Sequence, residues 1–140
     1  MQKKAVLILV GVVLTLMICG VLLALNFINK PHVNAGSLDP VFRLDASGLF
    51  GEYSRDEAAA NRKFVDKVIE VKGTVLDREE TDSTMSVLLS TGDPVAAINC
   101  SFRLAGHEKL NLPPKGGLVT IKGKCAGFLN DVNVVDCVIE

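Results

Sequence analysis

The chain has 140 residues and a formal charge of −1, which leaves room for one folded domain and a short appendage. Beyond residue 30, twelve Lys and Arg stand against sixteen Asp and Glu, a formal charge of −4. Domains that bind nucleic acid usually carry a basic surface, because phosphate contacts supply most of the non-specific affinity. The composition therefore disfavours nucleic acid as a partner.

The first feature along the chain is an apolar segment without a charged residue from Ala5 to Leu25. At about 1.5 Å per residue a helix of this length reaches roughly 30 Å, enough to cross the core of a bilayer. Lys3 and Lys4 precede it and favour a cytoplasmic N-terminus. Residues 1–29 are thus predicted to be a cytoplasmic tip and a transmembrane anchor in the inner membrane, with the C-terminal domain in the periplasm.

Two alternatives for this segment remain open. A cleaved signal peptide has an apolar region of about 7–15 residues followed by a small-residue cleavage site, and this run is longer. A lipoprotein anchored through Cys19 is the other alternative, because residues 16–20 loosely resemble a bacterial lipobox. Ile18 stands where such a motif prefers a small residue, so the uncleaved anchor is the primary prediction.

Residues 30–44 have the Pro, Gly and small polar residues of a linker, and residues 45–140 are predicted to fold. Apolar residues recur at spacings of three and four from about 46 to 63, which predicts an amphipathic helix. Asp45 stands at its N-cap position. Gly48 and Gly51 weaken the prediction for the first turns.

After this helix the pattern changes to alternation of apolar and polar residues, which is typical of half-buried strands. Strands are predicted around residues 70–75, 84–90, 95–102, 117–127 and 132–140. An acidic turn is expected at 77–83, and a connector at 103–115 with one or two helical turns within 104–110. Five strands with a connector between the third and the fourth are typical of the OB-fold, a Greek-key barrel. Gly73 and Gly123 lie deep in predicted strands and are interpreted as corners of the barrel.

The stretch from about residue 49 to 139 resembles a bacterial family of OB-fold proteins named for its likeness to the tRNA anticodon-binding domain. The resemblance rests on Asn61, Gly116 and the segments 67–75, 99–102, 119–127 and 136–139. It implies an OB barrel in a bacterial, often membrane-linked or lipoprotein-like setting. It brings no catalytic residue with it, and a shared fold does not by itself define a function.

An OB-fold binds ligands on its second and third strands, between the loops after the first and the fourth strand. The candidate ligand loops contain the polar residues Asp77, Glu79, Glu80, Asp82, Asn130 and Asp131. Phe102 is the one aromatic residue on those two strands, and its alternation with Ile98 and Cys100 points it toward the core. Base stacking therefore has no evident platform.

Cys100, Cys125 and Cys137 follow the membrane segment at spacings that match no zinc motif. They are predicted to be buried, as free cysteines often are. The fifth strand of an OB barrel lies between the third and the fourth, so Cys137 could form a disulfide with either Cys100 or Cys125. Sequence alone does not choose between the two pairs.

Neither a catalytic constellation nor a metal or cofactor motif is predicted, because His107 has no evident nucleophile partner and the acidic turn lacks EF-hand spacing. The sequence thus predicts a mainly β protein, a membrane-anchored periplasmic OB-fold module that is not an enzyme. An envelope protein or an oligosaccharide is the expected partner. An oligonucleotide-binding OB-fold domain is the alternative.

Overall fold

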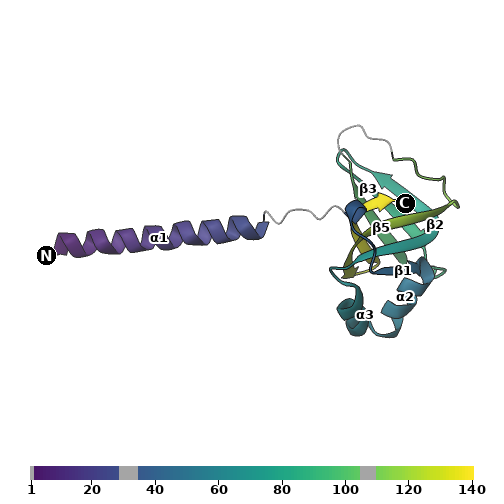
Figure 1. Ribbon diagram of the computed structural model, residues 1–140, viewed down its shortest axis with the longest axis horizontal. Helices are drawn as coiled ribbons and strands as arrows, with labels where there is room; N and C mark the ends of the chain where they lie inside the picture. The colour runs from purple at the N-terminus through teal and green to yellow at the C-terminus, as the bar shows by residue number, and fades with distance from the viewer. Residues whose placement is uncertain (1, 29–34, 105–109) are drawn as a thin grey trace. The chain divides into compact units, whose positions relative to one another are not determined.

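A computed structural model describes residues 2–28, 35–104 and 110–140, with side chains for 11–25, 35–104 and 110–140. The chain divides into two compact units, Met1–His32 and Val33–Glu140, each of which is considered by itself. One helix, α1 (Gln2–Ile28), makes up the described part of the first unit (Figure 1). Within the residues described, no helix combines the length and the apolar character needed to span a membrane.

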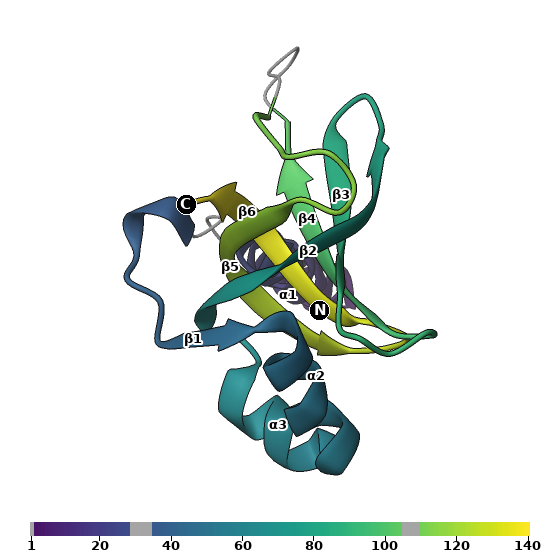
Figure 2. The ribbon, with the colours of Figure 1, turned by 90° about the vertical axis from the view of Figure 1, so that its right-hand side faces the viewer.

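The second unit is built on a closed barrel of five strands (Figure 2). These are β2 (Val68–Glu80), β3 (Thr84–Ser90), β4 (Ala97–Arg103), β5 (Leu118–Phe128) and β6 (Val132–Ile139). Neighbours pair in the order β2-β3-β4-β6-β5, and β5 pairs back onto β2. Strand β6 therefore lies between β4 and β5, and the predicted five-stranded barrel is confirmed.

Alternation along the strands fills the barrel. The inward positions of β3 and β4 are Met85, Val87, Leu89, Ile98, Cys100 and Phe102, and all six are buried. Phe102 is only 2% exposed, so the predicted inward orientation of this residue is confirmed. The residues between them point outward and form the outer face of the sheet.

Strand β2 is longer than predicted, because residues 77–80, three of them acidic, continue it instead of forming a turn. Asp77 pairs with Leu88, and Glu80 pairs with Met85, across the antiparallel ladder with β3. A bulge at Leu76 bends the strand, so that its first half pairs with β5 and its second half with β3. Ladder pairing with β3 outweighs the low strand propensity of Asp and Glu here.

Two short elements lie within residues 30–44, where the sequence predicts a linker. A 3₁₀ turn, η1 (Ala35–Ser37), packs against β5 and β6, and Ala35 is buried. Strand β1 (Phe42–Asp45) pairs in parallel with β2, with Phe42 opposite Ile69. Strand β1 pairs with the first half of the β2 edge whose second half pairs with β3, so residues 35–45 are part of the folded unit.

The predicted single helix is two helices, α2 (Ala46–Arg55) and α3 (Glu57–Phe64), which pack against each other at one end of the barrel (Figures 1 and 2). The break falls at Asp56, whose extended backbone ends α2 and whose Oδ1 accepts from the amide of Ala59 to cap α3. Asp45 occupies the N-cap position of α2, but its side chain makes no capping hydrogen bond.

The two glycines predicted at barrel corners have different roles. Gly123 lies at a bulge in the pairing of β5 with β6, and a Cβ there would come 2.7 Å from Cys137 Sγ. Gly73 lies in a regular stretch of ladder, where a Cβ would come 3.0 Å from the Cβ of Ala46 at the start of α2. Gly123 marks a corner, whereas Gly73 allows close packing of a helix.

The connector between β4 and β5 closes the barrel end away from the helices. Its side chains Leu104, Leu110 and Leu112 pack on the core. The helical turns predicted within 104–110 fall mainly on residues 105–109, outside the described residues. Gly116 has φ +84°, a conformation that favours glycine, and its amide donates to the Val75 carbonyl at 2.8 Å. The end of the connector is thereby fixed to β2.

Candidate functional site

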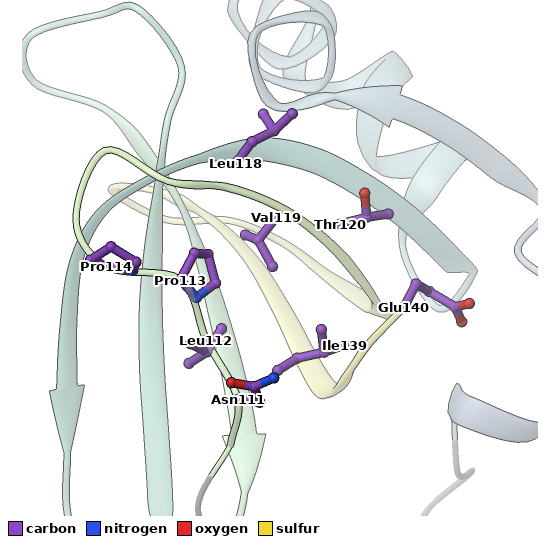
Figure 3. Close-up of a pocket in the computed structure, with 9 residues that line it drawn as sticks. All are labelled: Asn111, Leu112, Pro113, Pro114, Leu118, Val119, Thr120, Ile139 and Glu140. Carbon is purple, nitrogen blue, oxygen red and sulfur yellow. The ribbon is translucent and has the colours of Figure 1, made fainter.

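Two hollows stand out among the described residues of the folded unit. The first has a volume of about 580 Å³ and lies where the connector meets the ends of β5 and β6 (Figure 3). Leu112, Pro113 and Ile139 form the apolar part of its wall, while the side-chain carboxylate in its lining, that of Glu140, is paired with Lys122. These residues form a packing junction with no unpaired charge to recognise a ligand.

The second hollow, of about 420 Å³, lies on the outer face of β2, β3 and β4. Register explains why its residues meet: Glu79 stands opposite Ser86, and Leu88 stands between Asp77 on one side and Asn99 on the other. Its lining is Asp77, Arg78, Glu79, Ser86, Leu88 and Asn99. We call this hollow the β2–β4 site.

The two carboxylates of the β2–β4 site differ in their partners. Asp77 Oδ1 lies 2.7 Å from Lys115 Nζ on the connector and accepts from the Arg78 amide at 2.7 Å. The hydrogen bond from Lys115, and next that from the Arg78 amide, hold the pKa of Asp77 below its ordinary value. Glu79 is exposed and has no ion-pair partner within the described residues. One carboxylate is therefore structural and the other is available to a ligand.

Asn99 supplies an amide at the floor of the site. Its Nδ2 donates to Asn133 Oδ1 on β6 at 3.4 Å, and Asn133 Nδ2 in turn donates to the Asp131 carbonyl at 3.0 Å. The Oδ1 of Asn99 is buried without a hydrogen-bond partner in the described part of the chain. Such an acceptor costs about 1–3 kcal/mol, and reorienting the amide toward a ligand donor would relieve that cost.

The structure brings two of the six predicted ligand-loop residues into this site, namely Asp77 and Glu79. Glu80 and Asp82 are exposed near the β2–β3 turn and do not line it. Asn130 and Asp131 lie in the β5–β6 turn, where Asp131 Oδ1 accepts from the Ala97 amide at 2.8 Å. Asp131 is thus a turn-stabilising residue.

Four lining residues, Arg78, Ser86, Leu88 and Asn99, were missed by sequence reasoning. The sequence did indicate that Asn99 points outward, because Asn99 lies between the inward residues Ile98 and Cys100 of one strand. Which outward residues surround a hollow depends on the register between strands, which one sequence does not show.

Aromatic side chains gather at the helix end of the barrel. Phe42 meets Phe64 edge to face with ring centroids 5.2 Å apart, and Tyr53 stacks with Phe128 at 5.9 Å. Among the residues described, no aromatic side chain lines the β2–β4 site. Stacking of unpaired bases, which anchors single strands on many OB-folds, has no platform there.

Potential metal-ligating groups do not cluster in the described part of the domain. Over 35–104 and 110–140, no three His, Cys, Asp or Glu side chains lie close enough together to hold a metal ion. His32 and His107 lie outside the described residues. Cys100, Cys125 and Cys137 are free thiols and all three are buried, so their predicted burial is confirmed.

Known proteins resemble the chain in fold and in sequence family. A crystal structure from Klebsiella pneumoniae subsp. pneumoniae MGH 78578, named a "putative nucleic acid-binding lipoprotein", superposes with a TM-score of 0.57 at 14% identity. The alignment covers 79% of this chain and 99% of that one, which shows a shared fold. No curated protein matches the sequence. The family model tRNA_anti-like matches residues 1–139, and the chain therefore belongs to the tRNA_anti-like family.

Proposed function

We propose that this chain is a membrane-anchored periplasmic module that binds an oligosaccharide at the β2–β4 site and catalyses no reaction. The observation that carries the proposal is the position of the hollow, which lies on the face through which OB-folds bind oligosaccharides and oligonucleotides. Its volume of about 420 Å³ falls in the usual range for small-ligand sites.

The lining favours a sugar over the other ligand classes. The Glu79 carboxylate and the Ser86 hydroxyl can accept from sugar hydroxyls, and Leu88 offers an apolar surface for a ring face. A free carboxylate repels phosphate, and the formal charge of −4 beyond residue 30 adds to that repulsion. An envelope protein would need about 800 Å² of matching surface, which a hollow of this size does not supply by itself.

Isothermal titration of the full chain in detergent with tetrasaccharides of glucose and of N-acetylglucosamine tests this function. We expect Glu79→Gln to weaken binding of the preferred sugar about tenfold, the usual effect of losing one hydrogen bond to a charged group. Glu80→Gln is the matched control, because the neighbouring carboxylate does not line the site. Equal affinities for the two variants, or binding of neither sugar, would contradict the proposal.

Oligonucleotide binding is the second candidate, and the printed name of the Klebsiella neighbour favours it. If the chain binds oligonucleotides, a 12-nucleotide thymidine oligomer should bind with an affinity that falls steeply with salt, because released counterions drive such binding. If the oligosaccharide proposal holds, this oligomer should not bind at 150 mM salt. Saturable, salt-sensitive binding that Arg78→Ala abolishes would replace the oligosaccharide proposal.

The anchor in this proposal rests on the uncharged segment from Ala5 to Leu25 and the lysines before it. An alkaline phosphatase fused after Glu140 should be active, and added protease should reach the domain in spheroplasts. Lipid attachment at Cys19 is the alternative, and the neighbour's description as a lipoprotein supports it. Palmitate labelling that Cys19→Ser abolishes would establish the lipid anchor in place of an uncleaved helix.

A further inference from the structure

The barrel interior contains two neighbouring thiols. Cys100 on β4 is fully buried, and Cys137 on the adjacent β6 is 7% exposed. Cys100 stands opposite Val134 of β6 in the ladder, and the Cys137 thiol donates to the Val134 carbonyl at 3.4 Å, so both thiols lie beside the same residue. Burial, and next the neighbouring Cys100, raise the pKa of Cys137 above its ordinary value. Cys137 is therefore an uncharged thiol in the folded domain at neutral pH.

Cys125, the third thiol of the domain, is engaged elsewhere. It lies on β5, and its Sγ is 3.4 Å from the hydroxyl of Tyr53 on α2. Burial, and next this hydrogen bond, raise the pKa of the Tyr53 hydroxyl above its ordinary value. The contact holds Cys125 toward the helix end of the barrel, which separates its role from that of the other two thiols.

The backbone of β6 departs from regular geometry in order to face Cys137 inward. Val132 and Val134 point into the barrel, so simple alternation would place Asp136 inside and Cys137 outside. Asp136 instead has φ +51°, a left-handed conformation that is uncommon outside glycine. This residue resets the alternation, and Cys137 becomes the buried one.

Strand β5 leaves room for the same sulfur. Residue 123 is a glycine, and a Cβ at this position would lie 2.7 Å from Cys137 Sγ. Two separate departures from regular strand geometry, at Asp136 and at Gly123, thus accommodate one thiol beside Cys100. Neither departure is needed for an ordinary apolar core position.

We propose that Cys100 and Cys137 are the pair that forms a disulfide when the domain folds under oxidising conditions, and that Cys125 stays a thiol. Each paired cysteine loses its S–H bond as the S–S bond forms. Two electrons and two protons pass to the disulfide of a thiol–disulfide exchange partner, which becomes a dithiol. The bond would join β4 to β6, whose ladder covers only three residue pairs. Formation in the cell rests on the proposed periplasmic location.

Refolding with oxidised glutathione tests the pairing without reference to location. The reduced full chain is refolded in detergent with a mixture of oxidised and reduced glutathione, quenched with acid and alkylated. Peptide mapping should find residues 100 and 137 in one cross-linked pair, with a mass about 2 Da below that of the two thiol peptides and with Cys125 alkylated. Alkylation of Cys100, Cys125 and Cys137 alike, or a bond that includes Cys125, would overturn the proposal.

Serine variants provide the matched comparison. Cys125→Ser should keep the cross-link, whereas Cys100→Ser and Cys137→Ser should each remove it and leave the remaining partner open to alkylation after unfolding. If a serine variant fails to fold, the cross-linked wild-type peptide still decides the pairing. The same mapping on protein taken from cell envelopes reports location: a bond formed in vitro but absent in the cell refutes the periplasmic assignment and leaves the pairing intact.

Discussion

The two outer faces of the barrel use their charged residues in opposite ways. On β5 and β6, Lys122 points outward by alternation yet is only 8% exposed. The chain itself covers this residue, because Lys122 pairs with Glu140 and donates to the Gly36 carbonyl of η1 at 3.4 Å. On β2, β3 and β4, no described segment covers Glu79, and the outward side chains surround a hollow.

This difference shows where function is to be sought on a small barrel. Where the chain folds back over its own sheet, an outward charge becomes a structural contact and is unavailable to a ligand. Where the sheet is bare, the same alternation leaves a carboxylate, a hydroxyl and an amide open to a partner. Substitutions on the covered side should therefore change stability, and substitutions on the bare side should change binding.

The largest effect is expected at Gly123, which faces the core beneath the covered side. In Gly123→Ala the added Cβ would lie 2.7 Å from both Cys137 Sγ and Val134 Cγ1, and 3.0 Å from the Val135 carbonyl oxygen. Overpacking of this kind costs about 1–3 kcal/mol, and we expect the upper end because backbone as well as side chains must move. Urea unfolding followed by circular dichroism measures the change.

Gly48→Ala is the control for Gly123→Ala. No atom lies within 4 Å of a Cβ at this helical position, so alanine should stabilise α2 by up to about 1 kcal/mol. If Gly123→Ala behaves like this control, the core beneath β5 and β6 is loosely packed, and the covered side does not carry the stability assigned to it.

A smaller effect is expected from Lys122→Met, which removes the charge and keeps most of the apolar stem. The lysine side chain is 10% exposed but that of Glu140 is 41% exposed, so water can solvate the carboxylate left behind. We therefore expect a loss of about 1 kcal/mol. Hydrogen exchange at Gly36 and Ser37 should also speed up, because η1 loses its contact with Nζ.

Lys124→Met is the matched control on the same strand. Its partner Asp66 is 76% exposed, and exposed pairs contribute at most about 1 kcal/mol and often nothing measurable. Similar unfolding midpoints for the two methionine variants would show that the cover over Lys122 adds no stability.

Local pattern predicted the barrel well and its irregular parts poorly. Strand β3 occupies the predicted residues 84–90, because alternation over seven residues between two turn signals is a strong local signal. Strand β1 has four residues and exists only because β2 offers it an unpaired edge. The break at Asp56 involves neither Pro nor Gly, and it depends on a side-chain cap to Ala59 that the helical spacing does not reveal.

The sequence predicted which face of the barrel carries the site, but not which residues line it. Alternation places Asn99 on the outer face, and the OB topology names that face as the binding one. Glu79 faces outward only because the bulge at Leu76 shifts the alternation of β2. Asp131 has the same chemistry as Asp77, yet the β5–β6 turn uses its carboxylate to hold the Ala97 amide. Which polar residues are consumed by the fold depends on contacts between segments distant in sequence.

The smallest effect on stability is expected from Asp77→Asn, on the bare side. Asp77 and Lys115 are both exposed, so water screens their pair and the urea midpoint at pH 7 should stay close to that of the wild type. The folded pKa of Asp77 is lowered by Lys115, so the pair's contribution is present above the unfolded value of about 3.9 and is lost as the pH falls through the folded value. The wild type should therefore lose a small increment of stability below pH 4 that Asp77→Asn never had, and 1 M salt should erase the difference between them.

Asp82→Asn, an exposed change near the same turn, should match the wild type in both pH ranges. A large loss for Asp77→Asn at pH 7 would mean that the bare face is a structural surface like the covered one, and the case for a ligand at the β2–β4 site would then rest on Glu79 and Asn99 alone.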